Sequence, residues 1–242
     1  MINSFLLALQ LLTRIPVPIS IPPNPKTLGQ SVLYYPLVGA LIGFMLYALA
    51  YSLGSVDSNL SAALILTLWV GLTGGLHLDG IADCVDGWIG GQGDCEKSLL
   101  IMQDPNAGPM GVIALVLLLL LKFTAIAVLL KNDAISALII APIIGRASIL
   151  FFMVSTKYLR QNGLADQLNQ HLSHRQTVIS LALCALCSCF FIGLLATTCM
   201  ALFIYLLRTI FIKLFGGTTG DMYGASVELS ELTILLLAIT TL

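Results

Sequence analysis

Long runs of uncharged, apolar residues constrain the fold of this chain more than any other feature. Residues 112–121 and 232–242 contain no charged side chain. Only 10% of the 242 residues are charged, whereas an ordinary soluble domain has roughly a quarter. Such runs are typical of helices that have lipid as their solvent. We therefore expect an all-α fold, a polytopic integral membrane helical bundle, with residues 1–242 forming a single domain.

The apolar segments predict about six or seven transmembrane helices, each near the roughly 20 residues that a span requires. They cover about residues 32–53, 60–76, 110–130, 134–155, 177–197, 199–215 and 226–242. Residues 2–13 form a shorter apolar helix, which we expect to lie in the membrane interface. Prolines end that helix, and the proline-rich segment 21–26 is expected to be a surface loop.

Basic residues are distributed unequally between the loops on the two sides of the membrane. One set of loops contains only Lys131. The other set contains Arg14, Lys26, Lys97, Lys157, Arg160, Arg175, Arg208 and Lys213. The positive-inside rule assigns the richer set to the cytoplasm. Two polar inserts, residues 77–108 and 216–231, belong to that set, so the functional site is expected on the cytoplasmic side.

Three aspartates of the first polar insert follow directly after an apolar span. Asp79, Asp83 and Asp86 are spaced by four and three residues, which places them on one face of a helix. Stacked carboxylates repel one another, so we expect a cation to offset their charge. Oxygen ligands suit Mg²⁺, and the aspartates therefore predict a magnesium site. The alternative is a solvated helix end just outside the bilayer.

Two further candidates lie near these aspartates in the sequence. Asp104, in an Asp-Pro-Asn sequence, resembles an ordinary turn residue, although its carboxylate could reach back to the metal. His77 could act as a general base, since an unperturbed imidazole titrates near neutrality. It could equally orient Asp79 or cap the preceding span.

Charged residues also occur within the apolar spans. Lys122 and Arg146 either pair with buried acids or snorkel to the interface, or they clamp a phosphate. Asp221, Glu228 and Glu231 repeat the acidic spacing near the last span. Acids are also favoured in the first turns of a helix by its dipole, so this second set has two interpretations.

The second polar insert begins with Gly-Gly-Thr-Thr-Gly-Asp at residues 216–221. Its glycines suit a close approach of backbone N–H groups to an anion, so we expect Gly217 and Thr218 to contact substrate. A structural turn between spans is the alternative. The segment lacks the Gly-Lys-Ser/Thr sequence of a Walker A loop.

These residues predict a membrane enzyme that holds a divalent metal and transfers a phosphoryl-type group. A metal-ion transporter would need acids near the bilayer midplane, whereas these acids gather at helix ends. An interaction scaffold is the third alternative, and it would tolerate Asp83→Asn. The net charge of −1 gives no reason to expect nucleic-acid binding.

Five motifs follow one another along the chain. They are LLTRIPVP at 11–18, YPLVG at 35–39, GGLHLDGIADCVDG at 74–87, MQDPNAG at 102–108 and GGTTGD at 216–221, the last followed by Glu228. Together they resemble the cobalamin synthase family, the adenosylcobinamide-GDP ribazoletransferases. The block at 74–87 is the most specific of them.

The resemblance implies a multi-pass enzyme of the cell inner membrane that assembles the nucleotide loop of cobalamin. Its substrates would be adenosylcobinamide-GDP and α-ribazole or α-ribazole 5′-phosphate. Its products would be adenosylcobalamin or its 5′-phosphate, together with GMP. Mg²⁺ is the cofactor of the family. Membrane lipid is a further expected partner, and the sequence is compatible with a homo-oligomer.

The resemblance also implies roles for individual residues. It assigns the metal to Asp79, Asp83 and Asp86, and we expect Asp104 to join them. The acid/base role is our own inference from residue chemistry: we expect one of these aspartates or His77 to deprotonate the ribazole hydroxyl. The expected substrate-binding residues are Lys122, Arg146, Gly217, Thr218, Asp221 and Glu228.

Overall fold

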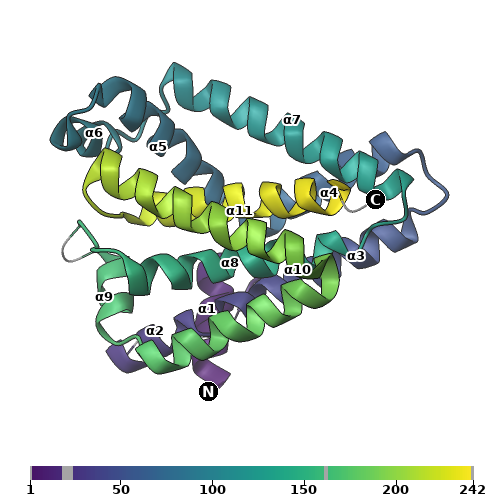
Figure 1. The fold of residues 1–242 in the computed structure, drawn as a ribbon, viewed down its shortest axis with the longest axis horizontal. Coiled ribbons are helices and arrows are strands. Elements are labelled where there is room, and N and C mark those ends of the chain that lie inside the picture. Colours follow the sequence, from purple (N-terminus) through teal and green to yellow (C-terminus); the bar gives the residue numbers. More distant parts are fainter. Residues whose placement is uncertain (1, 18–23, 161–162, 241–242) are drawn as a thin grey trace.

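The computed structural model describes residues 2–17, 24–160 and 163–240, which are helical almost throughout (Figure 1). Within these ranges there is no β-strand, and one isolated bridge joins Tyr158 to Thr218. The expected all-α fold is confirmed. The helices are α1 (Ile2–Leu12), α2 (Pro25–Val32), α3 (Tyr35–Ser52), α4 (Ser58–Thr73), α5 (Leu76–Gly91), α6 (Cys95–Ile101), α7 (Pro109–Lys131), α8 (Ala137–Ser155), α9 (Leu164–Gln170), α10 (His174–Phe215) and α11 (Gly220–Thr240).

The length and composition of the helices confirm a multi-pass membrane bundle. Five helices of the described residues are long and apolar enough to cross a bilayer, namely α3, α7, α8, α10 and α11. Helices α4 and α5 pass the same test together but meet at an angle of 88°. They form either a broken span or a re-entrant pair, which raises the number of candidate spans to six. Helix α1 has 11 residues and is too short to cross alone.

Helix α10 differs from the expected pair of spans at 177–197 and 199–215. It runs over 42 residues, about twice the length that a bilayer requires. Its direction reverses at Gly193, whose φ of 80° and ψ of 167° are accessible because glycine has no Cβ atom. Two arms lead from this point toward the same end of the molecule (Figure 1). The expected boundary is wrong, because hydropathy does not mark a turn that one glycine makes within an apolar run.

Three other expected boundaries are also corrected. Of the expected loop 21–26, residues 21–23 lie outside the described residues, and Pro25 already begins α2. Asn24 caps this helix by accepting a hydrogen bond from the N–H of Lys26 at 3.1 Å. The long polar loop 157–175 contains helix α9. Helix α11 begins at Gly220, so the acids of the second insert all lie on one helix.

Helix α8 is buried along most of its length and packs closely against α3. Gly39 and Gly43 of α3 face it. A Cβ atom at Gly39 would collide with the carbonyl oxygen of Pro142, and one at Gly43 would lie 2.6 Å from that of Ile139. The two backbones therefore touch, as is typical of small residues four apart in membrane helices.

The two polar inserts lie at the same end of the bundle. In Figure 1, helices α5, α6 and α9 gather at the left, together with the first turn of α11. The connection between α7 and α8 lies at the right. The fold thus brings the acids of α5 and Asp221 of α11 to one end of the molecule. Glu228 and Glu231 lie about two and three turns further along α11 and are buried, so the expectation that the acids gather at helix ends is wrong for these two.

Candidate active site

Helices α5 and α11 place the acids of the two polar inserts side by side. Gly80 of α5 lies against the first turn of α11, where a Cβ atom would collide with the carbonyl oxygen of Asp221. A Cβ atom at Gly224 would lie 3.3 Å from the Cα atom of His77. Both glycines therefore allow backbone contact, and Asp79 lies directly beside this contact in the chain.

Asp79, Asp83 and Asp221 form what we term the acidic cluster. Asp83 is partly buried and lies within electrostatic range of the other two carboxylates. Asp79 and Asp221 line the same cavity. Among the described residues, the ion pair of this cluster is made by Arg160, whose Nη1 atom lies 2.9 Å from Oδ2 of Asp221. One guanidinium against three carboxylates leaves an excess of negative charge.

Sequence reasoning uses Arg160 only to orient the chain, and the structure adds it to the site. Two backbone hydrogen bonds hold the segment before it. The N–H of Leu159 donates to Thr218 and the N–H of Thr218 donates to Lys157, both at 2.9 Å. Nη2 of Arg160 also donates to the carbonyl oxygen of Met102 at 3.1 Å. The signal in the sequence is a basic residue just after an apolar span.

Gly217 and Thr218 are buried in this backbone pairing. A Cβ atom at Gly217 would lie 2.6 Å from the carbonyl oxygen of Lys157. The hydroxyl groups of Thr218 and Thr156 are 2.7 Å apart. These contacts are those of a structural turn, one of the two alternatives that the sequence allows. Contact of Gly217 and Thr218 with substrate stays a prediction.

Asp86, the third aspartate of α5, is engaged by the beginning of α7. Its carboxylate accepts hydrogen bonds from the N–H groups of Gly108 at 2.7 Å and Gly111 at 2.9 Å. A Cβ atom at either glycine would collide with this carboxylate. The carboxylate thus satisfies free amides at a helix N-terminus, where negative charge is also favoured. These contacts are structural, and metal binding by Asp86 stays a prediction.

Asp104 lies in the exposed segment between α6 and α7. Its Oδ1 atom accepts hydrogen bonds from the backbone N–H and from Nδ2 of Asn106, both at 2.9 Å. The backbone donor and then the side-chain donor hold the pKa of the Asp104 carboxyl below its ordinary value. The residue therefore forms the ordinary turn that the sequence suggests, and its contact with a metal stays a prediction.

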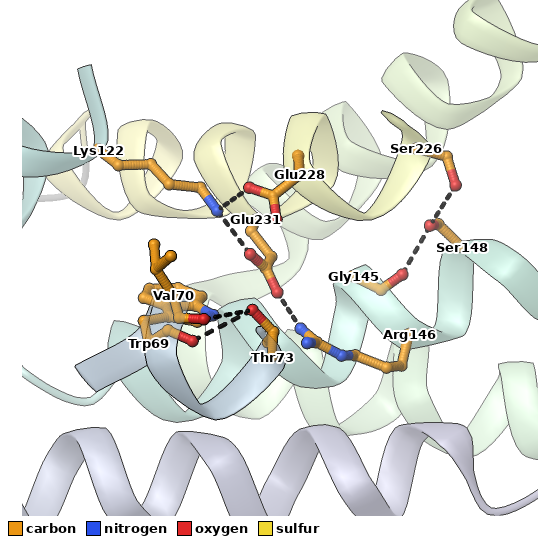
Figure 2. A network of polar contacts seen from close by, with 10 residues as sticks. All are labelled: Trp69, Val70, Thr73, Lys122, Gly145, Arg146, Ser148, Ser226, Glu228 and Glu231. Atoms are coloured by element: carbon orange, nitrogen blue, oxygen red, sulfur yellow. Dashed lines mark hydrogen bonds and ion pairs between the residues drawn. The ribbon is translucent and has the colours of Figure 1, made fainter. Parts of the chain in front are cut away.

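Lys122, Arg146, Glu228 and Glu231 form a buried ion network between α7, α8 and α11 (Figure 2). Nζ of Lys122 lies 2.6 Å from Oε2 of each glutamate, and Arg146 pairs with Glu231. The same ammonium lies 4.7 Å from the ring centre of Trp69, within the range of a cation–π contact. The pairing with buried acids is thus observed. Substrate contact by Lys122, Arg146 and Glu228 stays a prediction.

His77 lies on the helix of the acidic cluster and within electrostatic range of Lys122 and Arg146. It is only 4% exposed. Among the described residues, its Nε2 atom has no hydrogen-bond partner. A buried polar atom without a partner costs about 1–3 kcal/mol, so this nitrogen favours a bound group that can pair with it. Both predicted roles of His77 stay open.

The acidic cluster fits a magnesium ion by the chemistry of its donors. No group of three His, Cys, Asp or Glu side chains in the described part of the chain is arranged to enclose an ion by itself. Mg²⁺ does not require such an enclosure, because it usually takes one or two carboxylates and completes its shell with water and substrate phosphates. Oxygen donors with excess negative charge at an open cavity meet that requirement.

Comparison with known proteins gives one consistent result. The sequence model of a family described as cobalamin-5-phosphate synthase matches residues 4–239. A Pseudomonas aeruginosa protein named adenosylcobinamide-GDP ribazoletransferase is 46% identical over 236 residues, which cover 97% of this chain and 96% of the relative. A Pseudomonas putida protein of the same name is 46% identical over 242 residues, covering 98% and 99%. No solved structure matches.

Proposed function

The chain belongs to the cobalamin-5-phosphate synthase family, and from this premise we propose that it joins adenosylcobinamide-GDP to α-ribazole with release of GMP. α-Ribazole 5′-phosphate is the alternative acceptor. The product is adenosylcobalamin or its 5′-phosphate. The observation that supports this reaction most directly is the acidic cluster. Its carboxylates have excess negative charge and lie beside a cavity, at the end of the bundle where the two polar inserts meet.

The proposed reaction is a substitution at phosphorus. A ribose hydroxyl oxygen of α-ribazole forms a bond to the phosphorus atom that is attached to cobinamide. The bond from this phosphorus to the bridging oxygen of the diphosphate breaks, and that oxygen leaves with GMP. The hydroxyl proton passes to the carboxylate of Asp79 or Asp83, or to His77. A 5′-phosphorylated acceptor requires that the attacking group is a hydroxyl of the ribose ring.

Asp79, Asp83 and Asp221 are the residues that we propose to hold Mg²⁺. The sequence also suggests Asp86 and Asp104, but their carboxylates accept hydrogen bonds from the start of α7 and from Asn106, so we leave them out of the proposed ligand set. When bound, this ion neutralises the charge of a diphosphate. Arg160 is fixed beside Asp221 and orients its carboxylate. Because Lys122 is already occupied by two glutamates, phosphate binding depends more on the acidic cluster than on the buried cations.

We propose that the chain lies in the cell inner membrane with its acidic cluster on the cytoplasmic side. Outside the buried ion network, nearly all of the lysines and arginines lie in the segments that the sequence assigns to that side, as the positive-inside rule requires. Nucleotide substrates are also available on that side.

The experiment uses purified full-length protein in lipid nanodiscs, supplied with adenosylcobinamide-GDP, α-ribazole and Mg²⁺. We expect equal amounts of GMP and cobamide. Chelation of divalent ions is expected to abolish both products, and added Mg²⁺ is expected to restore them. Absence of GMP from the complete mixture would contradict the transferase reaction, and full activity after chelation would contradict the metal. Metal flux across liposomes without product would favour a transporter.

A further inference from the structure

A cavity of about 520 Å³ opens beside the acidic cluster. Asp79, Asp221 and Arg160 form its polar side. Its remaining wall is mainly apolar and includes Ile149 and Met153 of α8, which are 5% and 4% exposed. The volume lies within the roughly 300–1,000 Å³ of small-molecule sites. The cavity therefore suits a ligand that has one apolar part and one polar part.

Without a bound cation, the charges of this cavity disfavour a polyanion. Among the described residues, its walls carry the carboxylates of Asp79 and Asp221, and the guanidinium of Arg160 is already paired with Asp221. A diphosphate or a guanine nucleotide would therefore meet repulsion inside the cavity unless a cation accompanied it. A neutral sugar would not, because its hydroxyl groups can donate hydrogen bonds to carboxylates. A corrin with its amide side chains is far larger than a nucleoside and does not suit this volume.

Aromatic and polar groups along the wall match a flat heteroaromatic base. Three tyrosines line the cavity. Tyr35 is buried, and the ring centres of Tyr158 and Tyr223 lie 6.0 Å apart. The hydroxyl of Tyr158 is protonated near neutral pH, as in any tyrosine, and can donate a hydrogen bond. His77 also lines the cavity, and its Nε2 atom is the buried nitrogen that lacks a partner among the described residues. A base with an unshared ring nitrogen, or a sugar hydroxyl, would satisfy it.

We infer that this cavity is the subsite for the nucleoside acceptor, a benzimidazole riboside. Its base packs against Tyr35, Ile149 and Met153, and its ribose faces Asp79 and Asp221. This assignment rests on the proposed function and adds to it the location of one substrate. The larger corrin substrate remains outside the cavity, with only its diphosphate reaching the acidic cluster.

Two matched tryptophan variants test this subsite. Ile149→Trp fills the acceptor cavity, whereas Leu118→Trp fills a separate apolar cavity of about 640 Å³ between α5, α7, α10 and α11. Both residues are aliphatic and 5% exposed. Ile149→Trp is expected to raise the KM for α-ribazole at least about tenfold and to leave the KM for adenosylcobinamide-GDP unchanged. Leu118→Trp is expected to change neither. Thermal melting in detergent monitors folding.

If Ile149→Trp does not fold, a direct binding measurement tests the subsite instead. The intrinsic fluorescence of α-ribazole reports its binding to the wild-type protein without the second substrate. His77→Gln, which keeps hydrogen-bonding capacity, is expected to bind α-ribazole more tightly than His77→Leu. Equal affinity of the two variants, or a folded Ile149→Trp protein with unchanged KM for α-ribazole, would overturn the subsite.

The failure of this inference differs from failure of the proposed function. If wild-type protein binds α-ribazole but releases no GMP from the complete mixture, the proposed transferase reaction is contradicted and the proposed subsite is not. The opposite result is GMP release with a KM for α-ribazole that Ile149→Trp does not change, or that Leu118→Trp changes as much as Ile149→Trp does. That result contradicts the subsite and leaves the reaction supported.

Discussion

The buried ion network and the acidic cluster both include side chains of α11, yet they differ in charge balance and in access. The network combines two cations with two anions, and its members are nearly or fully buried. The acidic cluster combines three carboxylates with one guanidinium and borders a cavity. A buried charge must be paired within the protein, whereas an excess charge at a cavity can be offset by what binds there.

This difference separates residues that hold the helices together from residues that meet a ligand. Lys122, Arg146 and Glu231 come from α7, α8 and α11, so their ion pairs join three helices at one point. The excess charge of the acidic cluster contributes repulsion to the ligand-free protein. Substitutions in the network should therefore reduce stability, and substitutions in the acidic cluster should reduce activity.

Glu231→Gln is expected to produce the largest change. Glu231 pairs with both Lys122 and Arg146, and an amide leaves two buried cations without this countercharge. Removal of one partner from a buried ion pair costs about 3–5 kcal/mol, so the variant should melt at a markedly lower temperature in detergent. Glu228→Gln is the matched control with a smaller loss, because Glu228 pairs with Lys122 alone among the described cations. Equal melting temperatures of Glu231→Gln and the wild type would contradict a structural role for Glu231.

Asp83→Asn is expected to reduce activity with little effect on stability. Loss of one preorganised electrostatic group lowers turnover about 10²–10³-fold, and removal of one like charge relieves repulsion in the ligand-free protein. Turnover is followed as GMP release, and folding as thermal melting. Asp133→Asn makes the same chemical change in the turn after α7 and should leave turnover unchanged. A loss of stability without loss of turnover would place Asp83 with the buried network instead.

Asp86→Asn tests whether a third aspartate of α5 has a structural role or binds the ion with Asp79 and Asp83. The amide of asparagine offers one oxygen where the carboxylate accepts two backbone donors, from Gly108 and Gly111. These hydrogen bonds are partly buried, and loss of one to a charged acceptor costs about 1–3 kcal/mol. We therefore expect a lower melting temperature and an unchanged Mg²⁺ concentration for half-maximal activity. An unchanged melting temperature with a raised Mg²⁺ requirement would instead support Asp86 as a metal ligand.

Local spacing predicts the acidic face of α5, because helical periodicity depends only on near neighbours in the chain. The pairing of Asp86 with glycines 22 and 25 residues later is not visible in that spacing. Arg160 and Tyr35 reach the site from distant segments, and no local pattern marks such convergence. The turn at Gly193 is hidden for a different reason, since the apolar composition continues through it. Sequence therefore identifies the membrane bundle and its acids, whereas packing determines which acids bind a ligand.

Asp104→Ala should produce the smallest change and tests the boundary of the acidic cluster. Asp104 is exposed, and the hydrogen bonds of its carboxylate are made with Asn106, two residues away. A carboxylate that stabilises its own turn in water contributes little to the packed helices, so we expect wild-type melting and turnover. The Mg²⁺ concentration for half-maximal activity should also be unchanged, because Asp79, Asp83 and Asp221 remain intact. A raised Mg²⁺ requirement in this variant alone would show that the segment between α6 and α7 closes over the cluster when the ion binds, and would extend the ligand-binding region beyond α5 and α11.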